Sequence, residues 1–88
     1  MPQYPSLTHA LGEALVDLVW FVEGADDEYM DQDDAVKALE GVAAMVNRLS
    51  SSQRAEFQQV IEAMTEAETD PSRREFLAAF PDGFGLEE

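Results

Sequence analysis

The sequence contains no cysteine and few basic residues, and these two shortages exclude several classes of function. Without cysteine there is no disulfide framework, no zinc–thiolate site and no cysteine nucleophile. Lys and Arg total 5 against 19 Asp and Glu, which gives a formal net charge of −14. Because clustered Lys and Arg are what bind phosphate groups, we predict no direct binding to nucleic acid or to anionic membranes.

Long apolar runs are also missing. The longest, residues 18–22 (LVWFV), is far shorter than the roughly 20 residues that a membrane-spanning helix needs. The first residues, MPQYP, lack the basic start and the apolar stretch of a signal peptide. We therefore expect a cytoplasmic protein.

The length and the periodicity of the sequence predict its fold class. A chain of 88 residues suffices for one modest hydrophobic core, so we expect a single helical domain over residues 1–88. The lead segment 1–6 and the tail 82–88 are its least firmly held parts. No segment alternates like a strand, whereas apolar residues recur at steps of three and four in four segments. The sequence predicts an all-α fold, a small antiparallel bundle of three longer helices and one short C-terminal helix.

The first two helices have recognisable ends. Ser6 or Thr8 is the predicted N-cap of the first, and Gly24 its left-handed stop. Asp31 or Asp33 is the predicted N-cap of the second. The predicted buried positions of the first helix are Leu7, Leu11, Leu15, Leu18 and Val22. Those of the second are Val36, Leu39, Val42, Ala43, Val46 and Leu49.

The other two helices start at stronger signals. Ser50 and Gln53 form a capping box, and Asp70-Pro71 places a capping carboxylate before a proline at the first helical position. We expect the fourth helix to stop at Pro81. The predicted buried residues are Phe57, Val60, Ile61 and Met64 in the third helix and Phe76, Leu77 and Phe80 in the fourth. The glycine-rich tail either stays flexible or folds back by inserting Phe84 and Leu86.

An acidic loop joins the first and second helices, and its carboxylates are Asp26, Asp27, Glu28, Asp31, Asp33 and Asp34. The calcium loop of an EF-hand needs oxygen ligands and a glycine at fixed positions. Counted from Asp31, those positions fall on Ala35 and Val36, so we predict no metal site and no cofactor. Weak association with a divalent ion is a minor alternative.

Two interpretations of this loop stay open. It is either a solvated connection with a helix cap, or a docking surface for a basic protein partner. Tyr29 and Met30 favour docking, since aromatic and thioether side chains anchor interfaces, although both side chains also suit packing against the bundle. Similarly, Trp20 and Phe21 lie off the predicted buried face of the first helix. They are either covered by the loop or the tail, or they form a hydrophobic interface.

Enzymatic activity is not predicted. His9 is the only histidine, and its i,i+4 pair with Glu13 is ordinary for a helix surface. Glycine-rich phosphate loops, G-x-S-x-G and H-E-x-x-H are all absent. Arg73 and Arg74 are expected to pair with Glu68, Asp70 or Glu75.

In length, helical pattern and acidity the chain resembles small bacterial immunity proteins that neutralise nuclease toxins. The Tyr-Tyr-Pro segment of the nuclease-colicin immunity family is absent and Tyr29 stands alone, so no residue role is carried over. The resemblance implies a cytoplasmic inhibitor that docks on a basic toxin domain.

We therefore expect a non-enzymatic binding protein that engages a basic partner, with an immunity protein as its most concrete form. The alternative is a structural or regulatory module that homodimerises through the first helix. A nucleic-acid mimic that occupies the basic groove of a DNA-binding protein would share the electrostatics of the first hypothesis.

Overall fold

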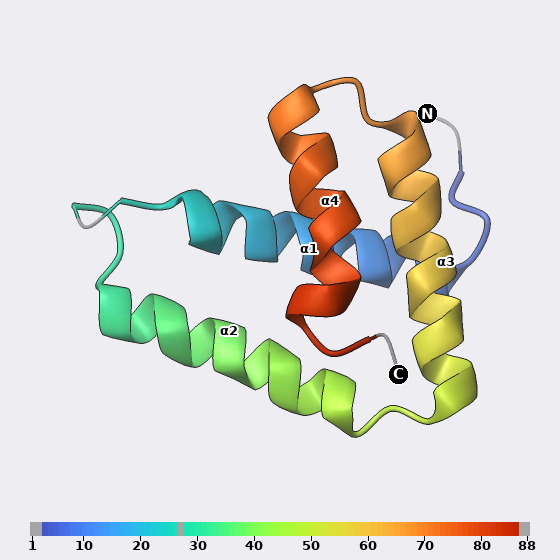
Figure 1. Ribbon diagram of the computed structural model, residues 1–88, viewed down its shortest axis with the longest axis horizontal. Helices are drawn as coiled ribbons and strands as arrows, with labels where there is room; N and C mark the ends of the chain where they lie inside the picture. Colours follow the sequence, from blue (N-terminus) through green and yellow to red (C-terminus); the bar gives the residue numbers. More distant parts are fainter. Residues whose placement is uncertain (1–2, 27, 87–88) are drawn as a thin grey trace.

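The computed structural model describes residues 3–26 and 28–86, and this part of the chain contains helices and no strand. The helices are α1 (Leu7–Gly24), α2 (Gln32–Asn47), α3 (Ser51–Ala67) and α4 (Pro71–Gly83). The predicted all-α class, with three longer helices and a shorter C-terminal one, is confirmed. Figure 1 shows two antiparallel hairpins, α1–α2 and α3–α4, with the second lying across the first.

The N-caps form at predicted residues, because each offers a side-chain oxygen to the free N–H groups of a first turn. The Ser6 hydroxyl accepts from the backbone of His9 at 3.0 Å. Ser50 and Gln53 complete the capping box of α3, with bonds of 3.2 and 2.9 Å. Asp70 caps α4, whose first residue is Pro71. The helix starts are thus fixed by local sequence.

The hydrophobic core lies where the α3–α4 hairpin packs on α1. The four predicted residues of α3 are all buried, as are Leu77 and Phe80 of α4. Edge-to-face contacts connect Phe80 with Phe57 and Phe76, each with ring centroids 5.9 Å apart. Val46 is the one residue of α2 that is fully buried, while Leu39, Val42 and Leu49 are half-buried.

The predicted buried face of α1 is wrong for three of its five residues, while Leu15 and Val22 are half-buried. Val16 and Val19 point into the core, whereas Leu7, Leu11 and Leu18 are exposed. The helix is apolar on two opposite sides, and periodicity alone cannot say which side meets the core. Gly12 decides it physically, because the helix can approach α3 closely there: a Cβ on Gly12 would lie 3.3 Å from Val60 Cγ1.

Two predicted helix ends also differ. Gly24 is the last residue of α1 and is not left-handed, since the chain leaves through an extended Ala25. The helix α4 continues past Pro81 to Gly83. The N–H of Phe84 bonds the carbonyl of Phe80 at 3.0 Å, so the helical turn goes on although Pro81 itself has no N–H to donate.

The described part of the tail, up to Leu86, folds back, which the sequence left open. Gly85 adopts a left-handed φ of 75°, and the N–H groups of Gly85 and Leu86 bond the carbonyls of Asp82 and Pro81 at 3.4 and 2.8 Å. This is the Schellman pattern. It places Leu86 in the core with no exposed surface and stacks Phe84 on Phe80.

Arg73 connects the two hairpins. Its guanidinium is hydrogen-bonded to Asp17 of α1 and lies 2.8 Å from Glu68 at the end of α3. The bond to Asp17 is the main reason why the pKa of Arg73 is raised. The pair with Glu68 was expected, but the pair with Asp17 was not predicted. Among the described residues, no helix is long and apolar enough to cross a membrane.

Candidate functional site

The acidic loop lies at the tip of the α1–α2 hairpin, far from the α3–α4 hairpin (Figure 1). Asp26 organises its first half, since its side chain accepts from the backbone of Glu28 at 2.9 Å. Its carbonyl accepts from Tyr29 and Met30, both at 3.1 Å. The tip is therefore a hydrogen-bonded turn. Asp27 lies outside the described residues.

Asp31 organises the second half of the loop by capping α2. Its carboxylate accepts from the backbone of Asp33 at 2.8 Å and of Asp34 at 3.4 Å. Asp33 and Asp34 stand in the first turn of α2, where the positive end of the helix dipole stabilises negative charge. Of the six predicted carboxylates, Asp26 and Asp31 therefore have a structural task.

Glu28, Asp33 and Asp34 are exposed, and none of them forms an ion pair within the described part of the chain. Nor do the described residues gather three Asp, Glu or His side chains as a metal ion would require. The free carboxylates thus project an uncompensated negative charge from the tip of the hairpin.

A hollow of about 640 Å³ opens beside this loop, and we call it the tip hollow. Its lining joins the end of α1 to the loop and consists of Trp20, Phe21, Gly24, Ala25, Asp26 and Tyr29. Tyr29 is 82% exposed and Phe21 64%. Such exposure of two large aromatic side chains is typical of interface anchors.

Trp20 forms the inner wall of the tip hollow rather than a free anchor. Its ring packs on Phe76 of α4, with centroids 5.0 Å apart, and Arg73 lies 6.0 Å from its centroid. The side chain is half-buried, and Phe76 of α4 supplies a cover that the sequence did not suggest. Phe21 and Tyr29 are left as the accessible aromatic groups.

The structure brings together two sets of residues that the sequence analysis treated separately. Trp20 and Phe21 were a possible interface of the first helix, whereas Asp26 and Tyr29 belonged to the acidic loop. All four line one hollow. Trp20 lies in the last turns of α1, and only a short turn separates the end of the helix from Tyr29. This closeness in the sequence could have predicted that the two side chains lie near each other.

The sequence analysis missed the exposed leucines of α1. It assigned Leu7, Leu11 and Leu18 to the core, but their side chains are 73%, 61% and 63% exposed. Their spacing alone gives no warning, since a buried stripe has the same period.

The tip hollow supplies an apolar floor, two accessible aromatic rings and the carboxylate of Asp26. These groups suit a cationic side chain or peptide. Comparison of the chain with family models, with curated proteins and with solved structures found no match.

Proposed function

We propose that this protein is a non-enzymatic binding protein that engages a basic protein partner at the tip hollow. The observation that carries the proposal is that exposed Phe21 and Tyr29 line one hollow with Asp26 of the acidic loop. The aromatic rings would lose their water on binding and supply apolar contact area, and the carboxylates would favour a positively charged partner.

The charge distribution supports fast association. The net charge of −14 attracts a basic protein from a distance, and Glu28, Asp33 and Asp34 concentrate that field at the tip. On contact, an Arg or Lys of the partner would place its aliphatic stem on Tyr29 and Phe21 and its charged end near Asp26. In this proposal the exposed carboxylates attract the partner from a distance, and the two aromatic side chains hold it after contact.

The most concrete form of this proposal is a cytoplasmic inhibitor that neutralises a toxin with a basic surface, as an immunity protein does. The sequence's resemblance to small acidic helical immunity proteins supports this form. An inhibitor of this kind needs no catalytic group, which agrees with the proposed non-enzymatic role.

The test begins with affinity capture from the producing organism, with the purified protein as bait and elution by increasing salt. We expect one basic protein to be retained and released by salt. Recovery of no basic protein would contradict the proposal. A partner that elutes together with DNA would point instead to a nucleic-acid mimic.

Matched charge reversals then locate the site on the isolated partner. The tip variant is Glu28→Lys, Asp33→Lys and Asp34→Lys, and the control variant is Glu40→Lys, Glu62→Lys and Glu66→Lys. Three reversals change the net charge by two units each, so both go from −14 to −8. The tip variant should slow association about tenfold or more at low salt and flatten its salt dependence, because steering is local.

The control variant should have a clearly smaller effect on the association rate. Equal effects of the two variants would show that only the total charge matters, and the tip hollow would lose its role. Tyr29→Ala should act differently and mainly accelerate dissociation, by roughly tenfold or more if it is an anchor.

A further inference from the structure

α1 has a second apolar side that nothing in the described structure covers. This outer face consists of Leu7, Leu11, Ala14, Leu18 and Phe21. At 100° per residue these positions lie on the side of the helix opposite Val16 and Val19, which are buried. Its four large side chains are 61–73% exposed. A helix that is apolar on opposite sides is usually buried on both.

The outer face carries no charge. The acidic residues of the middle of α1 stand to one side of it and are engaged there, Glu13 with His9 at 3.5 Å and Asp17 with Arg73. The surface is thus free of carboxylates on a chain whose net charge is −14. A basic partner has no electrostatic reason to prefer it.

We propose that the outer face is covered by the same face of a second copy of this chain, in an antiparallel two-fold dimer. A two-fold axis at Ala14 places Leu7 opposite Phe21 of the other copy, and Leu11 within one residue of Leu18. The large residues then meet in complementary pairs, while the small Ala14 lets the two helices approach at the axis. The alternation of four- and three-residue steps is the spacing that packs helix against helix.

The charge distribution favours the antiparallel arrangement over a parallel one. Each acidic loop follows the C-terminus of α1, which is about 27 Å long for its 18 residues. A parallel pair would bring two such loops together. The antiparallel pair separates them and places each near the positive end of the other α1, whose first turn has no acidic residue.

The exposed area is sufficient for a dimer. The chain has 6247 Å² of accessible surface, whereas a folded monomer of 9.8 kDa is expected to have roughly 5,200 Å². The four large side chains of the outer face would each bury on the order of 100 Å², hence about 800 Å² over two copies, and their neighbours raise this toward the roughly 1,000 Å² that a specific interface needs.

The first test is the oligomeric state of the full chain by sedimentation equilibrium over a range of micromolar concentrations. We expect a mass of twice 9.8 kDa at the upper end. Leu11→Asp and Leu18→Asp should each weaken the dimer about tenfold or more, because a carboxylate would be desolvated in the interface. Val36→Asp is the matched control, since Val36 is 51% exposed on α2 and lies off the outer face.

A monomeric wild-type protein throughout this range would overturn the proposal. So would a dimer that Val36→Asp weakens as much as the outer-face variants do. All three substituted residues are exposed, so the variants are expected to stay folded, and circular dichroism checks this.

A crosslinking test locates the two-fold axis of the dimer. Since the chain has no native cysteine, every disulfide must form at the introduced residue. Ala14→Cys should form an intermolecular disulfide under mild oxidation, because Ala14 meets its own copy. Leu7→Cys should not, since seven residues on each side of the axis separate the two sulfurs by about 21 Å. Ala44→Cys, at an exposed position of α2, gives the background rate of disulfide formation. Crosslinking of Leu7→Cys, or of Ala14→Cys only at the background rate, would contradict the antiparallel dimer.

Salt distinguishes this proposal from the proposed function. Added salt should strengthen the dimer by screening two like-charged chains, whereas it should weaken binding of a basic partner at the tip hollow. Because Phe21 belongs to both surfaces, Leu11 and Leu18 report on the dimer, and Tyr29 reports on the tip hollow. Either proposal can thus fail while the other stands.

Discussion

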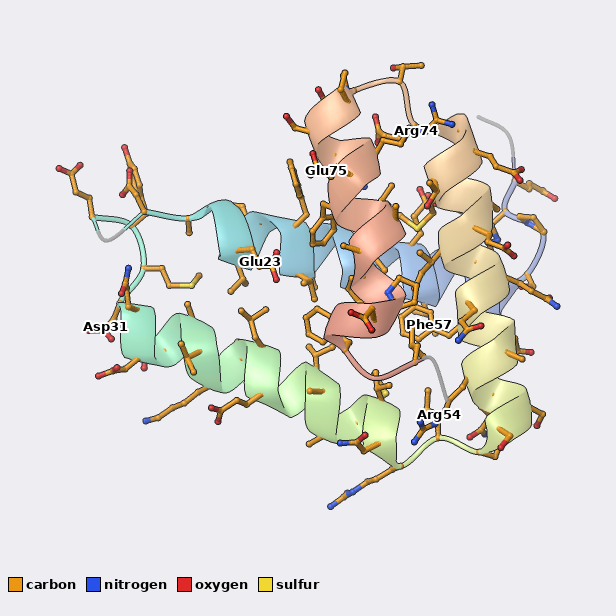
Figure 2. All side chains as sticks on the ribbon, viewed as in Figure 1. Glu23, Asp31, Arg54, Phe57, Arg74 and Glu75 are labelled. Carbon is orange, nitrogen blue, oxygen red and sulfur yellow. The ribbon has the colours of Figure 1, made fainter. Side chains whose placement is uncertain are left out.

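The α3–α4 hairpin and the α1–α2 hairpin use their apolar residues in different ways. In the first, the large hydrophobic residues of the inner faces are buried and stack on one another around Phe80. In the second, only Val16, Val19 and Val46 are fully buried. Figure 2 shows the α1–α2 hairpin extending sideways from the packed side chains, toward Asp31 at its tip. Its exposed large hydrophobic residues are Leu7, Leu11, Leu18, Phe21, Tyr29, Val36 and Met45.

This difference suggests a division of labour. The α3–α4 hairpin, with one side of α1 and the folded tail, holds the contacts that stabilise the domain. The α1–α2 hairpin keeps apolar and negatively charged side chains exposed, and both proposals depend on these side chains. An extended arm explains the radius of gyration of 13.3 Å, compared with about 12 Å expected for 88 residues.

The largest expected effect comes from truncating the same residue type in the two regions. Leu77 of α4 has no exposed surface, and Leu18 of α1 is 63% exposed. Leu77→Ala should lower the free energy of unfolding by about 2–5 kcal/mol, because it removes buried contacts and leaves a cavity. Leu18→Ala should change it by about 0.5 kcal/mol or less. Urea unfolding measures both.

These measurements belong at a protein concentration where the chain is monomeric, so that association does not contribute to the stability of the wild type. A cost for Leu18→Ala comparable with that for Leu77→Ala would show that the outer face packs within the monomer. The contrast between the two hairpins would then be lost.

The sequence predicts the α3–α4 hairpin far better than the α1–α2 hairpin, for a physical reason. Residues 50–53 and 70–71 carry caps that are complete within a few neighbouring residues. The apolar residues of α3 and α4 occupy one side only, so their period allows one orientation. α1 is apolar on two sides, and its orientation depends on the contact of Gly12 with Val60, which is a tertiary fact.

The candidate site divides along the same line. Sequence identified the acidic loop and narrowed the N-cap of α2 to Asp31 or Asp33, because both features are local. It could not show that Phe21 and Tyr29 share one hollow or that Phe76 covers Trp20, because these depend on how α1 lies on α4. Features that depend on residues close together in the sequence were predictable, and features that depend on how the helices pack were not.

A smaller effect is expected at the tail, which connects the stable region to α2. Gly85→Ala should lower the free energy of unfolding by about 1–2 kcal/mol, because an alanine resists the left-handed φ of 75°. The cost is conformational rather than steric, since a Cβ there meets only Asn47 Oδ1, at 3.7 Å. Gly85→Asn should recover part of the loss, as asparagine tolerates this conformation. Thermal unfolding of all three proteins compares them, and equal stabilities would contradict the role of the Schellman motif in holding Leu86.

The smallest effect compares two helical glycines of the α1–α2 hairpin. Gly41 of α2 has nothing within 4 Å of the position of a Cβ, whereas Gly12 of α1 faces Val60 at 3.3 Å. Gly41→Ala should raise the free energy of unfolding by about 0.5–1 kcal/mol, because alanine loses less backbone entropy in a helix. Gly12→Ala has the same helical advantage, but Val60 must shift by a few tenths of an ångström to admit the Cβ, so the variant should gain clearly less. Urea unfolding under identical conditions measures the difference. Equal gains at both positions would mean that α1 can move away from α3 at little cost, and the close approach at Gly12 would no longer explain which side of α1 faces the core.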